Sequence, residues 1–306
     1  MSAYPIRHHV VDCIVDCRSK LGEGAFWCPQ ERAVYWLDVP LPSLLHRYVP
    51  RTGRHDSWPM PEMISAMAKR ADGSLLVASQ RGINTFHHRT GELRPVVRPE
   101  RDKPANRSND GAPDAGGRFW IGTMQNNIAP DGSDLPLTGV QGALWRIDPD
   151  FRATRMADQI VIPNGIAWSP DHTTLYLVDS AIQTIFAYDF DLAGGAIANR
   201  RVLSDVKDLG YPDGSAVDAE GYIWNARWDG SAVVRIAPDG RIDRVVPIPA
   251  ERVTSCAFGG DDLATLYVTT SRLNVGAESL ARHPQQGGLF ALTPGVTGLP
   301  RPHFAG

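Results

Sequence analysis

The chain has 306 residues, of which 31 are lysine or arginine and 34 are aspartate or glutamate, so its formal net charge is −3 at pH 7. This balance provides no broad positive field, so we expect neither a nucleic-acid partner nor a membrane partner. No run approaches the roughly 20 apolar residues of a membrane span, and the N-terminus lacks an apolar stretch long enough for a signal peptide. We therefore expect a cytoplasmic protein, and the sequence leaves its oligomeric state open.

A repeat of roughly 40 to 50 residues, the length of a four-stranded propeller blade, runs along the chain. In each copy a turn rich in Asp, Gly or Pro precedes a short apolar strand. The strand centres fall near Trp36, Leu76, Trp120, Tyr176, Trp224 and Tyr267. A second hairpin follows each strand, as in LLHRYVPRTGRH after the first and VVRIAPDGRI after the fifth. The pattern predicts an all-β, six-bladed β-propeller that forms a single domain over residues 1–306.

The two ends of the chain are predicted to close this ring. The last copy is short of one strand after LFALTPG, while the N-terminal segment VVDCIVDC has the pattern of a strand without a blade of its own. Pairing of the two would remove an exposed sheet edge, which is prone to aggregation. We therefore predict that the N-terminal strand completes the last blade.

Polar residues recur at one position of the repeat. Eleven to thirteen residues before the strand centres stand Glu23, Ser65, Asn109, Asn164, Asp213 and Ser255. Blades aligned by their turns place these residues at one height on the strand nearest the axis, so we expect a shared polar chamber. Neutral groups there can simply satisfy backbone or bind water. The two carboxylates, Glu23 and Asp213, indicate a role beyond binding backbone or water, because buried charge is costly unless it is paired or bound to a cation.

Neither lysine nor arginine occupies these six positions, so a cation is the expected partner of Glu23, Asn164 and Asp213. The three side chains offer only oxygen donors, which suit hard ions such as Ca²⁺, Mg²⁺ or Mn²⁺ better than a structural zinc site of thiolates and imidazoles. We expect one divalent metal ion. Ca²⁺ is the first choice, and Zn²⁺, Mn²⁺, Mg²⁺ and Fe²⁺ remain alternatives.

Five segments of the sequence match motifs of a known protein family. They are LGEGAFW around Glu23, RSNDGAPDAGGRFWIGTM from Arg107, IPNGIAWSPD around Asn164, YPDGSAVDAEGYIW around Asp213 and TSCAFGG from Thr254. Together they resemble the gluconolactonase, regucalcin and senescence-marker-protein family of six-bladed propellers, over nearly the whole chain. The resemblance implies that Glu23, Asn164 and Asp213 bind the metal, and that Arg107 and Asn109 contact substrate.

The same resemblance implies metal-dependent hydrolysis of a small sugar lactone, a pentono- or hexonolactone. Asp213 is the candidate general base, although coordination to the ion would lower its pKa. Arg107 and Asn109 would orient hydroxyl and ring oxygens of the substrate. Some relatives carry a substrate-contacting glutamate three residues after the Met of GTM, where this chain has Asn127. Asn127 is the third candidate substrate-binding residue.

Two other functions fit the pattern. One is a calcium-binding or regulatory propeller without turnover, and the other is a related metal-dependent esterase with a roomier, more apolar mouth. Arg107 and Asn109 favour a polyhydroxylated substrate. The sequence has no G-x-S-x-G elbow, H-E-x-x-H or Walker loop, so covalent serine catalysis and nucleotide use are not expected. The choice among arabinono-, xylono-, galactono- and gluconolactone stays open.

Overall fold

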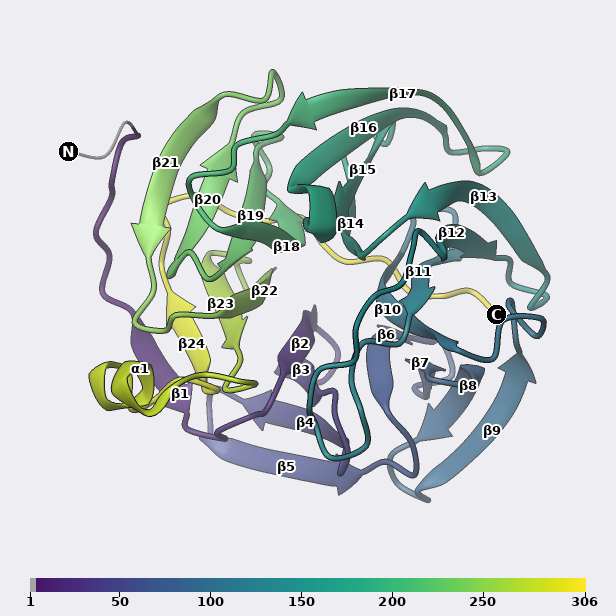
Figure 1. Ribbon diagram of the computed structural model, residues 1–306, viewed down its shortest axis with the longest axis horizontal. Coiled ribbons are helices and arrows are strands. Elements are labelled where there is room, and N and C mark those ends of the chain that lie inside the picture. The colour runs from purple at the N-terminus through teal and green to yellow at the C-terminus, as the bar shows by residue number, and fades with distance from the viewer. Residues whose placement is uncertain (1–3) are drawn as a thin grey trace.

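Six four-stranded antiparallel sheets surround a central axis in the computed structural model, which describes residues 4–306 (Figure 1). The innermost strands are β2 (Gly22–Cys28), β6 (Ile64–Lys69), β10 (Asn106–Pro113), β14 (Pro163–Trp168), β18 (Tyr211–Val217) and β22 (Val253–Gly259). The second strands are β3 (Ala33–Asp38), β7 (Leu75–Ser79), β11 (Phe119–Gln125), β15 (Thr174–Asp179), β19 (Ile223–Trp228) and β23 (Thr265–Thr270). Each predicted strand centre lies on one of these second strands, so the predicted six-bladed propeller is confirmed.

The outer half of each blade is the second hairpin of the repeat. The third strands are β4 (Leu44–Val49), β8 (Gly82–His87), β12 (Gly142–Ile147), β16 (Thr184–Asp191), β20 (Ala232–Ile236) and β24 (Leu289–Leu292). The outermost strands are β5 (Arg54–Pro59), β9 (Glu92–Val97), β13 (Ala153–Ile160), β17 (Ala196–Ser204), β21 (Ile242–Pro247) and β1 (Asp12–Val15). We number the blades 1 to 6 from β2 to β22. A short helix, α1 (Ala277–Arg282), lies between β23 and β24.

The ring is closed by its two ends. Strand β1 pairs antiparallel with β24, with Asp12 opposite Ala291 and Cys13 opposite Phe290. The sixth blade therefore has the order β1-β24-β23-β22, which confirms the predicted closure.

The hydrophobic core lies between neighbouring blades. Trp224 of blade 5 meets Phe258 of blade 6 edge to face, with ring centroids 5.9 Å apart, and both belong to one buried cluster. The turn before the second strand fixes the tryptophan of the repeat in two blades. Trp120 Nε1 donates to Asp114 at 2.8 Å, and Trp224 Nε1 donates to Asp218 at 2.9 Å. The Asp-Gly turns thus satisfy the indole N–H groups that would otherwise be buried without partners.

All six innermost strands carry a break in their pairing with the second strand. The breaks lie between Glu23 and Phe26, Ile64 and Ala66, Ser108 and Gly111, Asn164 and Ala167, Pro212 and Ser215, and Val253 and Ser255. Such bulges bend a strand and re-aim its side chains. Because the breaks recur at one height, they define a ring of irregular backbone around the axis.

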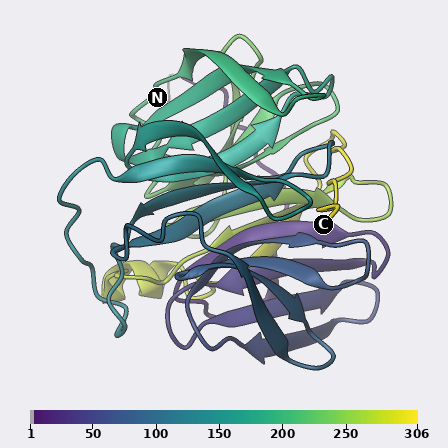
Figure 2. The same cartoon turned by 90° about the vertical axis from the view of Figure 1, so that its right-hand side faces the viewer.

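The two ends of the axis differ. Figure 2 shows α1 and the long loop after β11 at one end, whereas the C-terminus lies toward the other. No helix in residues 4–306 has the length and apolar character needed to cross a membrane.

Removal of β1 should destabilise the propeller. A chain that starts at residue 17 leaves β24 as an open edge and uncovers the apolar clusters that Cys13, Ile14 and Val15 cover. We expect its Tm, measured by circular dichroism, to fall by roughly 5 to 10 °C. A chain that starts at residue 9 keeps β1 and should lose far less. Equal Tm values for the two truncations would contradict closure by β1.

Candidate functional site

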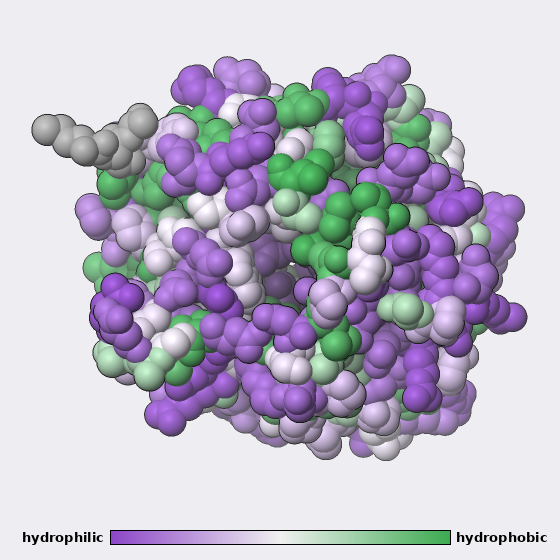
Figure 3. Space-filling view, viewed as in Figure 1, coloured by the Kyte–Doolittle hydropathy of each residue, from purple (hydrophilic) through white to green (hydrophobic). Residues whose placement is uncertain are grey.

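A cavity of about 400 Å³ opens at the end of the channel that carries α1. Figure 3 shows the hollow at the centre of this face. Its lining includes all six predicted site residues, Glu23, Arg107, Asn109, Asn127, Asn164 and Asp213. They come from blades 1, 3, 4 and 5, so the structure brings together residues that are up to 190 positions apart in the sequence (213 − 23). The two serines of the predicted ring, Ser65 and Ser255, are also buried but do not line this cavity.

The bulges of the innermost strands aim these side chains at the axis. Glu23 borders the break in β2, Asn109 lies within the break in β10, and Asn164 borders the break in β14. Gly165 follows Asn164 with φ +57, a left-handed conformation that glycine tolerates well. A Cβ at this position would also lie 2.8 Å from the carbonyl oxygen of Asp213. Glycine is therefore required for the close approach of blades 4 and 5.

A hydrogen-bond network joins the guanidinium and amide groups. Arg107 donates from Nη1 to Asn109 Oδ1 at 2.6 Å and from Nη2 to Asn127 Oδ1 at 2.8 Å. Asn109 in turn donates to Asn164 Oδ1 at 2.6 Å, and Asn164 donates to Ser180 Oγ at 2.9 Å. The network fixes the orientation of each amide, and it holds the oxygen of Asn164 toward blade 3.

The carboxylates of the cavity lack a comparable set of partners. Burial raises the pKa of Glu23 to about 8, with the negative charge of Asp110 as the next cause. Burial raises the pKa of Asp213 well above its ordinary value, with contributions from Glu23 and Asp110. Asp213 is 6% exposed, and its Oδ1 atom is buried without a hydrogen-bond partner. These two carboxylates therefore form a site that a positive charge would stabilise.

The donor set fits a hard divalent cation. Glu23, Asn164 and Asp213 present carboxylate and amide oxygens in one polar cavity, and Asp213 Oδ1 has no other partner. Within residues 4–306, no group of three His, Cys, Asp or Glu side chains is arranged to hold a metal. The amide of Asn164 is therefore needed as the third donor, and a thiolate or imidazole zinc site does not form here.

The sequence analysis missed a third acidic group, Asp110. Its charge acts on both Glu23 and Asp213, and its Oδ1 accepts a 2.7 Å hydrogen bond from the amide of Gly111. Strict alternation along a strand would place Asp110 and Asn109 on opposite faces. The break between Ser108 and Gly111 removes that alternation, so both side chains reach the channel. The adjacent Asn-Asp-Gly letters were the available signal.

Fold and site define a class of protein: a six-bladed propeller with carboxylates and amides gathered at one end of its channel. The chain belongs to the SMP-30/gluconolactonase/LRE-like family, whose model matches residues 21–272, which confirms the resemblance seen in the sequence. It is 36% identical to 6-deoxy-6-sulfogluconolactonase of Pseudomonas putida over 98% of this chain and 100% of that protein. It is 33% identical to regucalcin of Gallus gallus over 97% and 98% of the two chains.

A solved structure of a relative is similar to this chain over almost its whole length. The calcium-binding protein regucalcin from Agrobacterium tumefaciens superposes with a TM-score of 0.90 at 32% identity, and the match covers 98% of this chain and 99% of that chain.

Calcium should stabilise the protein more at higher pH. The pKa of Glu23 is raised from 4.5 to about 8 in the metal-free fold, so this fold loses stability as pH rises through that window. A bound cation offsets the loss because it favours the ionised carboxylates. We expect the rise in Tm caused by calcium, measured by differential scanning fluorimetry, to grow from about pH 5 to about pH 8. A rise that is independent of pH would contradict this assignment, and Glu23→Gln should flatten the profile.

Proposed function

We propose that this protein hydrolyses sugar lactones with one divalent ion held by Glu23, Asn164 and Asp213. The observation that carries the proposal is the meeting of a partly buried carboxylate, a buried carboxylate with an unpartnered oxygen, and an arginine-amide network in a single cavity. The similarity to a protein named 6-deoxy-6-sulfogluconolactonase supports the same reaction class. We infer that Ca²⁺ is the resident ion, since one solved relative is named a calcium-binding protein.

The reaction is an attack of water on the acyl carbon of the lactone. When bound, a divalent ion supplies Lewis-acid polarisation of the carbonyl. Asp213 accepts a proton from the attacking water, and the ring oxygen leaves as a hydroxyl group after it receives a proton from the same carboxyl. Burial raises the pKa of Asp213 in the metal-free fold, and coordination to the ion would lower it.

In this mechanism, the residues that orient the substrate are Arg107, Asn109 and Asn127. Arg107 is 4% exposed, and its Nε atom is buried without a partner. The amide of Asn127 can donate from its NH2 group to hydroxyl groups, whereas Asn109 already donates to Pro163 O and Asn164 Oδ1 and can only accept further. A polyhydroxylated lactone matches this polar wall, and the hydroxyl pattern of the substrate sets which lactone is preferred.

Non-catalytic calcium binding is the second candidate function, because regucalcin relatives resemble this chain over almost their whole length. A panel of aldonolactones assayed with a pH indicator separates the two. We expect acid release that stops on chelation and returns when calcium is restored. Calcium binding without acid release from any lactone in the panel would favour the second function.

Asp213→Ala should abolish turnover in a folded protein. The substitution removes both a metal ligand and the proton acceptor, so we expect kcat/KM for the best lactone to fall at least about 100-fold. Circular dichroism checks the fold. Asp239→Ala is the matched control, because Asp239 is an exposed carboxylate on the turn between β20 and β21. Full activity in Asp213→Ala would remove this residue from the mechanism.

Asn127→Ala should weaken substrate binding more than chemistry. Arg107 loses the acceptor of its Nη2 group and with it a fixed orientation. We expect KM to rise about 10-fold while kcat changes less than about twofold, the pattern of lost ground-state binding. Ser133→Ala, on the same loop, serves as the control. A fall in kcat with unchanged KM would instead place Asn127 in the chemical step.

A further inference from the structure

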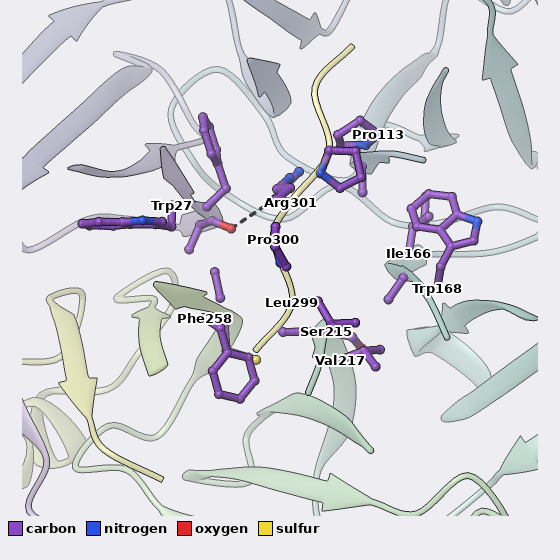
Figure 4. A pocket seen from close by; sticks show the side chains of 18 of the residues that line it. Trp27, Pro113, Ile166, Trp168, Ser215, Val217, Phe258, Leu299, Pro300 and Arg301 are labelled. Atoms are coloured by element: carbon purple, nitrogen blue, oxygen red, sulfur yellow. Dashed lines mark hydrogen bonds between the residues drawn. The ribbon is translucent and has the colours of Figure 1, made fainter. Parts of the chain in front are cut away.

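The C-terminal tail crosses the channel at the end opposite the cavity. Hydrogen bonds hold it on both sides of Arg301: Gly298 N donates to Leu263 O at 2.9 Å, and Phe304 N donates to Lys69 O at 2.9 Å. Phe304 is fully buried. Figure 4 shows the tail passing between Trp27 and Phe258 on one side and Ile166 and Trp168 on the other. The tail is therefore a fixed part of the channel.

Arg301 reaches from this tail to three innermost strands. Its Nη1 donates to Ala25 O, and its Nη2 donates to Met67 O and Gly111 O, each at 3.3 Å. The acceptors come from blades 1, 2 and 3. Ala25 lies within the break of β2 and Gly111 borders the break of β10, whereas Met67 is paired just beyond the break of β6.

These acceptors form a second level of the channel. Ala25, Met67 and Gly111 each stand two residues after a member of the upper ring, namely Glu23, Ser65 and Asn109. Arg301 lines the cavity beside the tail and not the cavity that Glu23 and Asp213 line. The guanidinium of Arg301 therefore occupies its own level, separate from the cavity proposed to hold the ion.

Asp110 supplies the opposing charge at this level. Burial raises the pKa of Asp110, and Arg301 is the first of the groups that lower it. Burial lowers the pKa of Arg301 to about 10, and the charge of Asp110 opposes that shift. The guanidinium thus donates to three carbonyl oxygens, and the charge of Asp110 acts on it without a direct ion pair between the two side chains.

Such a set of oxygens is also what calcium prefers. Ca²⁺ is bound in proteins by carboxylates and backbone carbonyls in flexible arrangements. We propose that Arg301 is a built-in cation, which fills a position whose oxygens would otherwise hold a second divalent ion. The position would be formed by the carbonyl groups of Ala25, Met67 and Gly111 together with Asp110. This inference rests on the proposed function in one respect: it counts the ion held by Glu23, Asn164 and Asp213 as the first divalent ion.

The surroundings of the tail leave room for this exchange. A cavity of about 140 Å³ lies beside Arg301, between the tail and the apolar side chains of Trp27, Trp168 and Phe258. Removal of the Arg301 side chain would enlarge this space and release three carbonyl oxygens in one step. The consequence for the native protein is that the lower channel keeps its positive charge whether or not metal is supplied.

The decisive measurement is the number of calcium ions bound. Equilibrium dialysis against CaCl₂ with metal analysis should show one more equivalent in Arg301→Ala than in wild type. We expect a dissociation constant for the added ion on the order of 0.1 to 1 mM, as in weak protein calcium sites. Arg301→Lys keeps the positive charge and should match wild type. Arg241→Ala removes an exposed arginine and is the matched control.

A second variant tests the donor set. Asp110→Asn combined with Arg301→Ala removes the carboxylate as well as the guanidinium, so the additional equivalent should disappear. Anomalous scattering from Mn²⁺ in crystals of Arg301→Ala should place the added ion among the carbonyl groups of Ala25, Met67 and Gly111. An added ion elsewhere would contradict the proposal.

Thermal unfolding gives a readout that is independent of activity. In the presence of a chelator, Arg301→Ala should unfold on the order of 5 °C below wild type, because Asp110 loses its counter-charge. Calcium should raise the Tm of this variant more than that of wild type. Equal calcium stoichiometry in the two proteins, or a variant that does not fold even with calcium, would overturn the inference. A wild type that binds no calcium would instead contradict the proposed function.

Discussion

Buried negative charge is the constraint on which the channel depends. Glu23, Asp110 and Asp213 lie in a narrow space where water cannot fully solvate them, and the pKa of each is raised by burial. Ionised carboxylates in such a place need positive charge nearby. Arg107 lies at the level of the cavity and Arg301 at the level below it, so two fixed cations face three acids. The divalent ion proposed for the cavity would balance the remaining negative charge.

The fold meets this constraint through irregular backbone. An innermost strand is the edge of its sheet, so a regular one would pair only alternate carbonyl groups with the second strand and send alternate side chains into the core. The recurring breaks bring further groups to the axis, such as the side chain of Asn109 and the carbonyl oxygen of Ala25. The same feature that interrupts the sheets therefore builds the polar channel, while the second and third strands of every blade pair without a break.

The sequence predicts those parts of the molecule that repeat. Each blade carries its own turn and apolar strand, so the blade number, the closure by β1 and the ring positions of Glu23, Asn164 and Asp213 follow from local pattern. Asp110 was missed because its position depends on a bulge, and the Asn-Asp-Gly letters that accompany the bulge do not by themselves show which side chains it turns toward the axis. Arg301 was missed for a different reason. It lies in a tail outside the repeat, and only the tertiary structure shows that the tail turns back into the channel.

The distribution of the site over blades links binding to ring closure. Glu23 belongs to blade 1, whereas Asn164 and Asp213 belong to blades 4 and 5, so none of these blades alone can form the cavity. The ring holds blade 1 beside blade 6 only when β1 pairs with β24 and the two blades pack together. A ligand that bridges blades 1, 4 and 5 binds the closed ring and not the open chain, so it stabilises closure by mass action. The tail acts in the same direction from the other end, because Arg301 joins blades 1, 2 and 3. Binding of such a ligand would therefore be linked to completion of the propeller.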